Sequence, residues 1–198
     1  AVIVTAGGVV SAVAVVSDMQ TGLIDRFRSL PMSRAAVLTA RTIADLLTQV
    51  IGTMVVAVAG LAIGWRIHNG PGDALVAFGL ALLFGYALSW AGVCLGMALR
   101  SVEAAQQLGF ILFLPFMFIS NAFVPTQGMP GWLQAVANWN PFSAIAAACR
   151  QLFGNPNPSA LVQAWPMQHP ELAVLLWSGL LLAVFAPLAV RLYTNKSR

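Results

Sequence analysis

Charged side chains are scarce in this chain. Only 8% of its 198 residues are Asp, Glu, Lys or Arg, whereas roughly a quarter are charged in an average soluble domain. Its mean hydropathy is +0.83, and 59% of its residues are hydrophobic. These values exclude an ordinary soluble protein, and the long apolar runs predict an all-α integral membrane protein.

Sequence motifs of enzymes and nucleotide-binding proteins are also missing. The chain has no GxxxxGK(S/T) loop to hold ATP phosphates, and no HExxH, Ser–His–Asp or paired-carboxylate motif. Cys94 and Cys149 have no metal-ligand spacing, and we expect no disulfide between them. His68 and His169 stand far apart without ligand partners and are interpreted as solvated or interfacial side chains. We therefore expect no catalytic residue, cofactor or metal in this chain.

Five apolar runs are long enough, or nearly so, to cross a membrane. The first reaches only about 25 Å at ~1.5 Å per residue, short of a ~30 Å hydrocarbon core. It follows neither an initiator Met nor a charged leader, so we expect the chain to begin inside a span and one further N-terminal span to make six. The predicted spans are 1–17, 42–64, 74–99, 104–124 and 171–190.

Basic residues favour one side of these spans. Eight lie on the connections at one end, and Arg66 and Arg150 lie at the other end. Since positive charge marks the cytoplasmic side, residues 21–41 and the C-terminus are predicted to be cytoplasmic. Residues 65–73 and 125–170 then face outward. The eight basic residues are Arg26, Arg28, Arg34, Arg41, Arg100, Arg191, Lys196 and Arg198.

A short amphipathic helix is predicted over about 21–30, between the first two spans. One of its faces is apolar and the other is charged, and Pro31 ends it because proline offers no N–H and clashes with the preceding turn. Such a helix can present its charges to a soluble partner at the cytoplasmic end; a basic helix resting on anionic lipid is the alternative. The apolar stripe is Leu23, Ile24, Phe27 and Leu30, and the charged face holds Asp25, Arg26 and Arg28.

Two further short helices are predicted within about 130–154. Asn140 and Pro141 form a helix start, as N-cap and first helical residue, and Gly154 stands where a C-terminal glycine belongs. Neither helix is long enough to span. We expect a re-entrant or interfacial hairpin at the outer surface; an amphipathic cap resting on the bundle is the alternative.

Asp45 is the one acidic residue inside a predicted span, which makes it a candidate functional residue. Arg41 precedes it by one helical turn, so a local ion pair is the alternative.

Small residues at helix-packing spacing predict that two helix faces contact protein, because such pairs let helices approach closely in lipid. The pairs are Gly60 with Gly64, and Gly92 with Gly96.

Phenylalanine is concentrated in the span 104–124, which Pro115 is expected to kink. Phe113 and Phe116, with Asn121, are candidates for lining a cargo route. The alternative is that these rings face lipid or neighbouring helices. The other phenylalanines considered for the route are Phe110, Phe118 and Phe123.

Two stretches carry a resemblance to a known family. GLIDRFRSLPMSR (22–34) resembles the cytoplasmic segment between the second and third spans of type-2 ABC exporter permeases, the daunorubicin-resistance and antibiotic or lipid exporter group. ISNAFVPTQGMPGWLQAVANWNPFSAIAAACRQLFG (119–154) resembles the end of the fifth span and the outer re-entrant helices of that group. The resemblance extends over essentially the whole chain, except that the N-terminal helix and first span of the family have no counterpart in it.

The resemblance implies a permease subunit of an ATP-driven exporter in a bacterial inner (plasma) membrane, moving amphipathic drugs, antibiotics or lipids outward. A second permease chain, identical or different, and a separate ATP-binding subunit that holds ATP and Mg²⁺ would complete it; no nucleic acid is expected. The coupling helix would contact the ATPase through Asp25, Arg26 and Arg28, with Leu23, Phe27 and Leu30 anchoring it to the spans. A membrane-embedded enzyme acting on lipid substrates is the alternative, and a passive channel or structural subunit is a third possibility.

Overall fold

The computed structural model describes residues 2–20, 34–99, 101–123, 128–157 and 162–195. Within these ranges the chain is helical and forms no strand, which confirms the predicted all-α class. The helices are α1 (Val2–Gln20), α3 (Arg34–Ile63), α4 (Pro71–Ala98), α5 (Val102–Ile119), α6 (Gly131–Trp139), α7 (Pro141–Leu152), α8 (Trp165–Gln168) and α9 (Pro170–Asn195).

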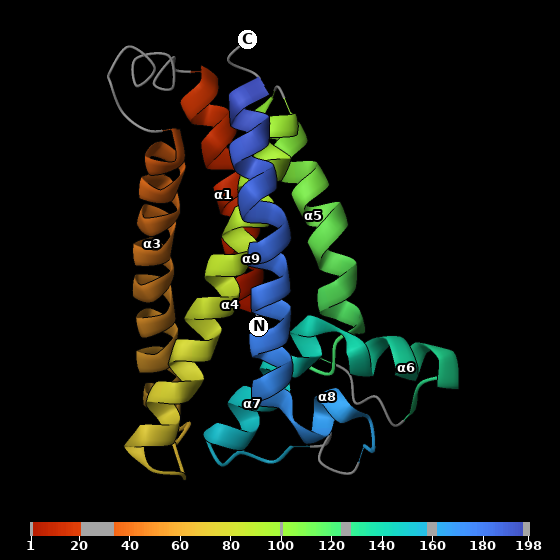
Figure 1. The fold of residues 1–198 in the computed structure, drawn as a ribbon. Helices are drawn as coiled ribbons and strands as arrows, with labels where there is room; N and C mark the ends of the chain where they lie inside the picture. Colours follow the sequence, from red (N-terminus) through yellow and green to blue (C-terminus); the bar gives the residue numbers. More distant parts are fainter. Residues whose placement is uncertain (1, 21–33, 100, 124–127, 158–161, 196–198) are drawn as a thin grey trace.

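The five long helices, α1, α3, α4, α5 and α9, lie along one another as a bundle (Figure 1). We call the end where α9 finishes the C-terminal end; α1 also finishes there and α3 begins there. Helices α6, α7 and α8 lie at the opposite end, which we call the α7 end (Figure 1). Within the described ranges, four helices are long and apolar enough to cross a membrane, and the apolar part of α1 is shorter. These four stretches are Thr39–Ile63, Pro71–Ala98, Val102–Ile119 and Pro170–Tyr193.

Several helix boundaries differ from the sequence expectation, including the end of α9 at Asn195 instead of residue 190. Helix α1 continues to Gln20 instead of stopping at residue 17, and α3 begins at Arg34 instead of 42. The first turns of α3 contain neither glycine nor proline and are rich in good helix formers, so the helix extends beyond the apolar run. Helix α5 ends at Ile119, before 124, where the Ser120 hydroxyl donates a hydrogen bond to the carbonyl of Met117 at 2.5 Å.

The ends of α7 match the sequence prediction. The side chain of Asn140 accepts a hydrogen bond from the N–H of Phe142 at 2.9 Å, and Pro141 is the first helical residue. Gly154 follows the helix with a φ of +70°, a conformation that glycine adopts without strain. Ile145, like Phe142, is buried in a core that α7 shares with α4 and α9. The local sequence therefore dictates where this helix starts, where it stops and which face it buries.

Helix α4 lies at the centre of the bundle, in contact with α1, α3, α5, α7 and α9. Its crossing with α1 is close enough to exclude side chains. A Cβ atom on Gly92 would lie 2.0 Å from the carbonyl oxygen of Gly8, and one on Gly96 would lie 2.5 Å from that of Ala12. The packing predicted for Gly92 and Gly96 is thus confirmed, with Gly8 and Ala12 as the matching small residues on α1.

The protein contact predicted for the face of Gly60 and Gly64 is present at Gly60 and not at Gly64 in the described residues. A Cβ on Gly60 would meet the ring of Trp65 at 3.5 Å, so its neighbour is the connection that follows α3 and not another helix. Gly64 has a φ of +106° and nothing within 4 Å of a built Cβ. It follows α3 in a left-handed conformation, which explains the glycine without any helix contact.

Candidate functional site

Polar side chains of α1 and α3 meet toward the C-terminal end of the bundle. Nη1 of Arg41 donates to Oδ2 of Asp18 at 2.6 Å, and Nε of Arg41 lies 3.5 Å from Oδ1 of Asp45, an ion-pair distance. The hydroxyl of Ser11 donates to Oδ2 of Asp45 at 2.7 Å. We call these four residues the α1–α3 clamp, because one guanidinium holds carboxylates from both helices.

Helical spacing places the clamp residues on facing sides of the two helices. Arg41 and Asp45 are one turn apart on α3, and Ser11 and Asp18 are two turns apart on α1. The exposed side-chain fraction is 10% for Asp45, 25% for Asp18 and 28% for Arg41. Partial burial reduces screening by solvent, so these charges attract more strongly than a surface pair would.

The ion pair between Arg41 and Asp45 is the local pairing that their spacing predicts. Sequence reasoning missed Asp18 and Ser11, because a predicted span ending at residue 17 left Asp18 outside it. The available signal was the i, i+7 spacing of Ser11 and Asp18, which puts both on one face of a largely apolar helix.

The clamp brackets the predicted coupling helix. Asp18 lies in the last turn of α1 and Arg41 in the third turn of α3, so the two residues stand on either side of the segment 21–33. That segment lies outside the residues that the structure describes. It includes the predicted ATPase-contact residues Asp25, Arg26 and Arg28, and the predicted anchoring residues Leu23, Phe27 and Leu30.

A cavity of about 180 Å³ continues the polar region between α1, α3 and α4. Asp45, Gln49 and Ser89 line it. Nε2 of Gln49 reaches the carbonyl of Ala81 on α4 at 3.4 Å, so this glutamine also bridges two helices. Polar side chains of α3 therefore reach toward α1 and α4 over several turns of the helix.

A larger cavity, of about 550 Å³, lies between α4, α5, α7 and α9; we call it the α5–α9 cavity. Its walls are almost wholly apolar and include Phe142 of α7 with Trp177 and Phe185 of α9. The described lining residues include no Asp, Glu, Lys or Arg. Its volume is in the range of sites that hold small organic molecules, about 300–1,000 Å³.

The structure separates the predicted cargo-route residues. Phe113 and Phe116 line the α5–α9 cavity, where they lie together. Asn121 does not line it. The remaining phenylalanines of the prediction, Phe110, Phe118 and Phe123, are exposed on the outside of the described bundle.

Asn121 instead belongs to a hydrogen-bonded junction between the end of α5 and α7. Its backbone N–H donates to the hydroxyl of Ser143 at 3.0 Å, and its carbonyl accepts from Nη1 of Arg150 at 3.0 Å. Nη2 of Arg150 also donates to the carbonyl of Ala122 at 3.3 Å. Burial lowers the pKa of Arg150 from its ordinary value, and the neighbouring Cys149 opposes this effect. Arg150 thus donates hydrogen bonds to two backbone carbonyls in the segment that follows α5.

The profile of the family described as ABC-2 type transporter matches residues 1–153, from α1 through α7. The chain belongs to the ABC-2 type transporter family. The resemblance read from the two sequence stretches is thereby confirmed, and this ABC-2 chain is a multi-pass membrane protein.

Several curated relatives are similar to this ABC-2 chain. The daunorubicin resistance ABC transporter permease protein DrrB1 of Streptomyces coeruleorubidus is 34% identical over 181 residues, covering 91% of this chain and 61% of the relative. The probable doxorubicin resistance ABC transporter permease protein DrrC of Mycobacterium tuberculosis is 25% identical, covering 93% and 63%. The putative transport permease ycf38 of Pyropia yezoensis is 28% identical, covering 76% and 52%.

The ABC-2 chain therefore spans about three-fifths of the length of the first two of these relatives. No solved structure matches it. The part of the chain that matches the family profile includes both helices of the clamp, the segment between them and the α5–α7 junction.

Proposed function

We propose that this chain is the transmembrane permease subunit of an ATP-driven exporter, which moves amphipathic drugs, antibiotics or lipids outward while a separate subunit hydrolyses ATP. The observation that supports this most is its similarity, over nine-tenths of its length, to permeases named for daunorubicin or doxorubicin resistance. The proposal includes a second permease chain, a bacterial inner membrane and a cytoplasmic C-terminus, which the distribution of basic residues supports.

In this proposal the segment 21–33 receives the motion of the ATP-binding subunit. The α1–α3 clamp makes the flanking helices move together, since Arg41 holds carboxylates on both. Helix α1 packs on α4 without intervening side chains at Gly92, so its displacement is passed to the centre of the bundle. Helix α4 forms one wall of the α5–α9 cavity, which is the proposed place for the apolar part of the cargo.

The alternative, a membrane-embedded enzyme acting on lipids, needs a group of titratable side chains at one place. Among the described residues no three His, Cys, Asp or Glu side chains come together closely enough to hold a metal ion. The acids of the clamp are engaged by Arg41 and Ser11. Nothing in the described part of the chain therefore favours the enzyme.

Reversing the charge of Arg26 and Arg28 together is expected to abolish coupling to the ATPase. The two arginines are proposed to contact an acidic surface of the ATP-binding subunit, and glutamate at both positions would place like charges against it. This repulsion lowers the affinity of the two subunits and disturbs their relative orientation. The measurement is copurification of the natural full-length chain with an ATP-binding subunit from mildly solubilised membranes, followed by cargo-stimulated ATPase activity.

A matched control is the double change Arg191→Glu and Lys196→Glu, which alters net charge equally in the basic C-terminal part. It is expected to leave ATPase binding intact. If the Arg26→Glu, Arg28→Glu variant retains both the ATPase and full transport, the proposed contact is refuted.

Filling the α5–α9 cavity is expected to lower transport without affecting ATPase binding. Ala91 lines this cavity from α4, and a phenylalanine there would occupy space that the apolar part of a cargo is proposed to use. We expect Ala91→Phe to reduce transport about tenfold, the effect of losing roughly 1–2 kcal/mol of favourable packing. Val184→Phe, at an exposed position of α9, is the control, and equal transport by both variants would contradict a role of the cavity.

A further inference from the structure

We propose that the α7 end of the bundle binds one glycerophospholipid, with an acyl chain in a cavity between α3, α4 and α7 and the phosphate at Arg66. We call this the α3–α7 cavity; its volume is about 360 Å³. It shares no lining residue with the α5–α9 cavity, so the proposal does not depend on the cargo or on the exporter function.

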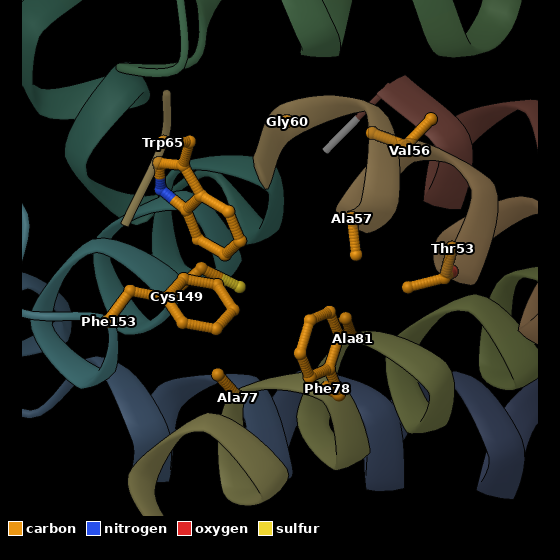
Figure 2. A pocket seen from close by; sticks show the side chains of 10 residues that line it. All are labelled: Thr53, Val56, Ala57, Gly60, Trp65, Ala77, Phe78, Ala81, Cys149 and Phe153. Atoms are coloured by element: carbon orange, nitrogen blue, oxygen red, sulfur yellow. The ribbon is translucent and has the colours of Figure 1, made fainter. Parts of the chain in front are cut away.

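The α3–α7 cavity exists because small residues face one another across it. Ala57 and Gly60 on α3 and Ala81 on α4 leave the space, and the rings of Trp65 and Phe153 bound it on one side. In Figure 2 these two rings lie across the empty centre from Val56 on α3. Trp65 is held against Phe153, with ring centroids 4.9 Å apart in an edge-to-face arrangement.

The lining of the α3–α7 cavity suits hydrocarbon and not water. It contains no charged side chain, and burial raises the pKa of the Cys149 thiol, which keeps that group neutral. An apolar cavity does not retain water, because water needs two to four polar partners there. Val56, which lines the cavity from α3, is 54% exposed, so the cavity opens onto the apolar outer surface of this predicted span.

Arg66 supplies a positive charge beside this cavity. Its Nη1 donates to the carbonyl of Leu61 at 3.0 Å and to that of Trp65 at 3.3 Å, so the guanidinium lies next to Trp65, which lines the cavity. Within the described residues it forms no ion pair with an acid, and its side chain is exposed. Three of its five N–H groups, one on Nε and two on Nη2, thus remain for a planar anion such as a phosphate.

A phospholipid combines the two features that the structure places together. Its acyl chain matches an apolar cavity open to the membrane, and its phosphate matches an arginine next to that cavity. An uncharged amphiphile would leave Arg66 without an anionic partner, and a free phosphate would leave the cavity empty. The anionic headgroup of phosphatidylglycerol makes it the preferred lipid.

Trp65 provides the probe, since bromine atoms on an acyl chain quench tryptophan fluorescence on contact. The natural full-length chain, with its partner subunits, is placed in bilayers of phosphatidylcholine containing a small fraction of brominated phosphatidylglycerol or brominated phosphatidylcholine. The emission of Trp65 is the difference between the wild type and Trp65→Phe. We expect brominated phosphatidylglycerol to quench this emission at about fivefold lower content than brominated phosphatidylcholine.

Two sets of variants test the two halves of the site. Ala81→Phe and, independently, Ala57→Leu fill the cavity and are expected to remove most of the quenching; Val58→Phe adds the same kind of bulk to α3 outside the cavity and is expected to leave it unchanged. Arg66→Gln is expected to remove the preference for the anionic lipid, whereas Arg66→Lys retains most of it.

Native mass spectrometry of the same variants supplies a second readout. We expect one phospholipid to be retained per chain in the wild type and none in the filled variants. Loss of quenching in both filled variants, together with loss of headgroup preference in Arg66→Gln, supports the site. Quenching equal to the wild type in a folded filled variant overturns it. So does a wild-type protein that fails to distinguish the two headgroups, which would make Arg66 a general interfacial anchor.

Discussion

Leucine in place of Gly92 is expected to abolish folded protein. The Cβ atom alone would lie 2.0 Å from the carbonyl oxygen of Gly8, a backbone atom that cannot move without shifting α1. Overpacking normally costs about 1–3 kcal/mol, and a clash with backbone exceeds that range because no side-chain rotamer relieves it. Since α1 packs on α4 at the centre of the bundle, separation of the two helices would expose that centre.

The measurement is the amount of monodisperse, detergent-stable protein recovered from membranes, by size-exclusion chromatography. Gly79→Leu is the matched control, because Gly79 lies on the same helix with nothing within 4 Å of a built Cβ. It is expected to behave like the wild type. Normal recovery of Gly92→Leu would contradict the close crossing of α1 and α4.

Alanine in place of Arg41 is the second change with a large expected effect. The substitution removes the guanidinium that pairs with the carboxylates of Asp18 and Asp45. Removing one partner of a buried pair costs about 3–5 kcal/mol, and the partial exposure of these side chains reduces the expected loss to about 1–3 kcal/mol. We expect lower thermal stability and a severe loss of transport.

A neutral variant separates stability from coupling. Asp18→Asn, Arg41→Gln and Asp45→Asn together remove all three charges, so no uncompensated carboxylate remains. We expect the thermal stability lost in Arg41→Ala to recover in this variant. The amount of cargo moved per ATP hydrolysed is expected to stay low, because no ion pair then holds α1 to α3. Wild-type transport per ATP in this variant would show that the clamp serves stability alone.

Much of the fold follows from short-range patterns in the sequence. Apolar runs determine that the chain is an all-α membrane protein, and Asn140 and Gly154 determine where α7 begins and ends, because capping depends on residues within one turn. The pairing of Arg41 with Asp45 follows from a single helical turn in the same way. The Gly92 and Gly96 spacing also predicts a close contact, although not its partner.

The partners of these residues were decided by the tertiary structure. Nothing local connects Asp18 to Arg41 or Gly92 to Gly8, because their relation depends on how two helices are rotated and shifted against each other. The same applies to Asn121, which sequence reasoning placed on a cargo route and the structure places in the α5–α7 junction. Cavities are likewise left by packing between distant segments, so composition reveals their apolar character but not their position.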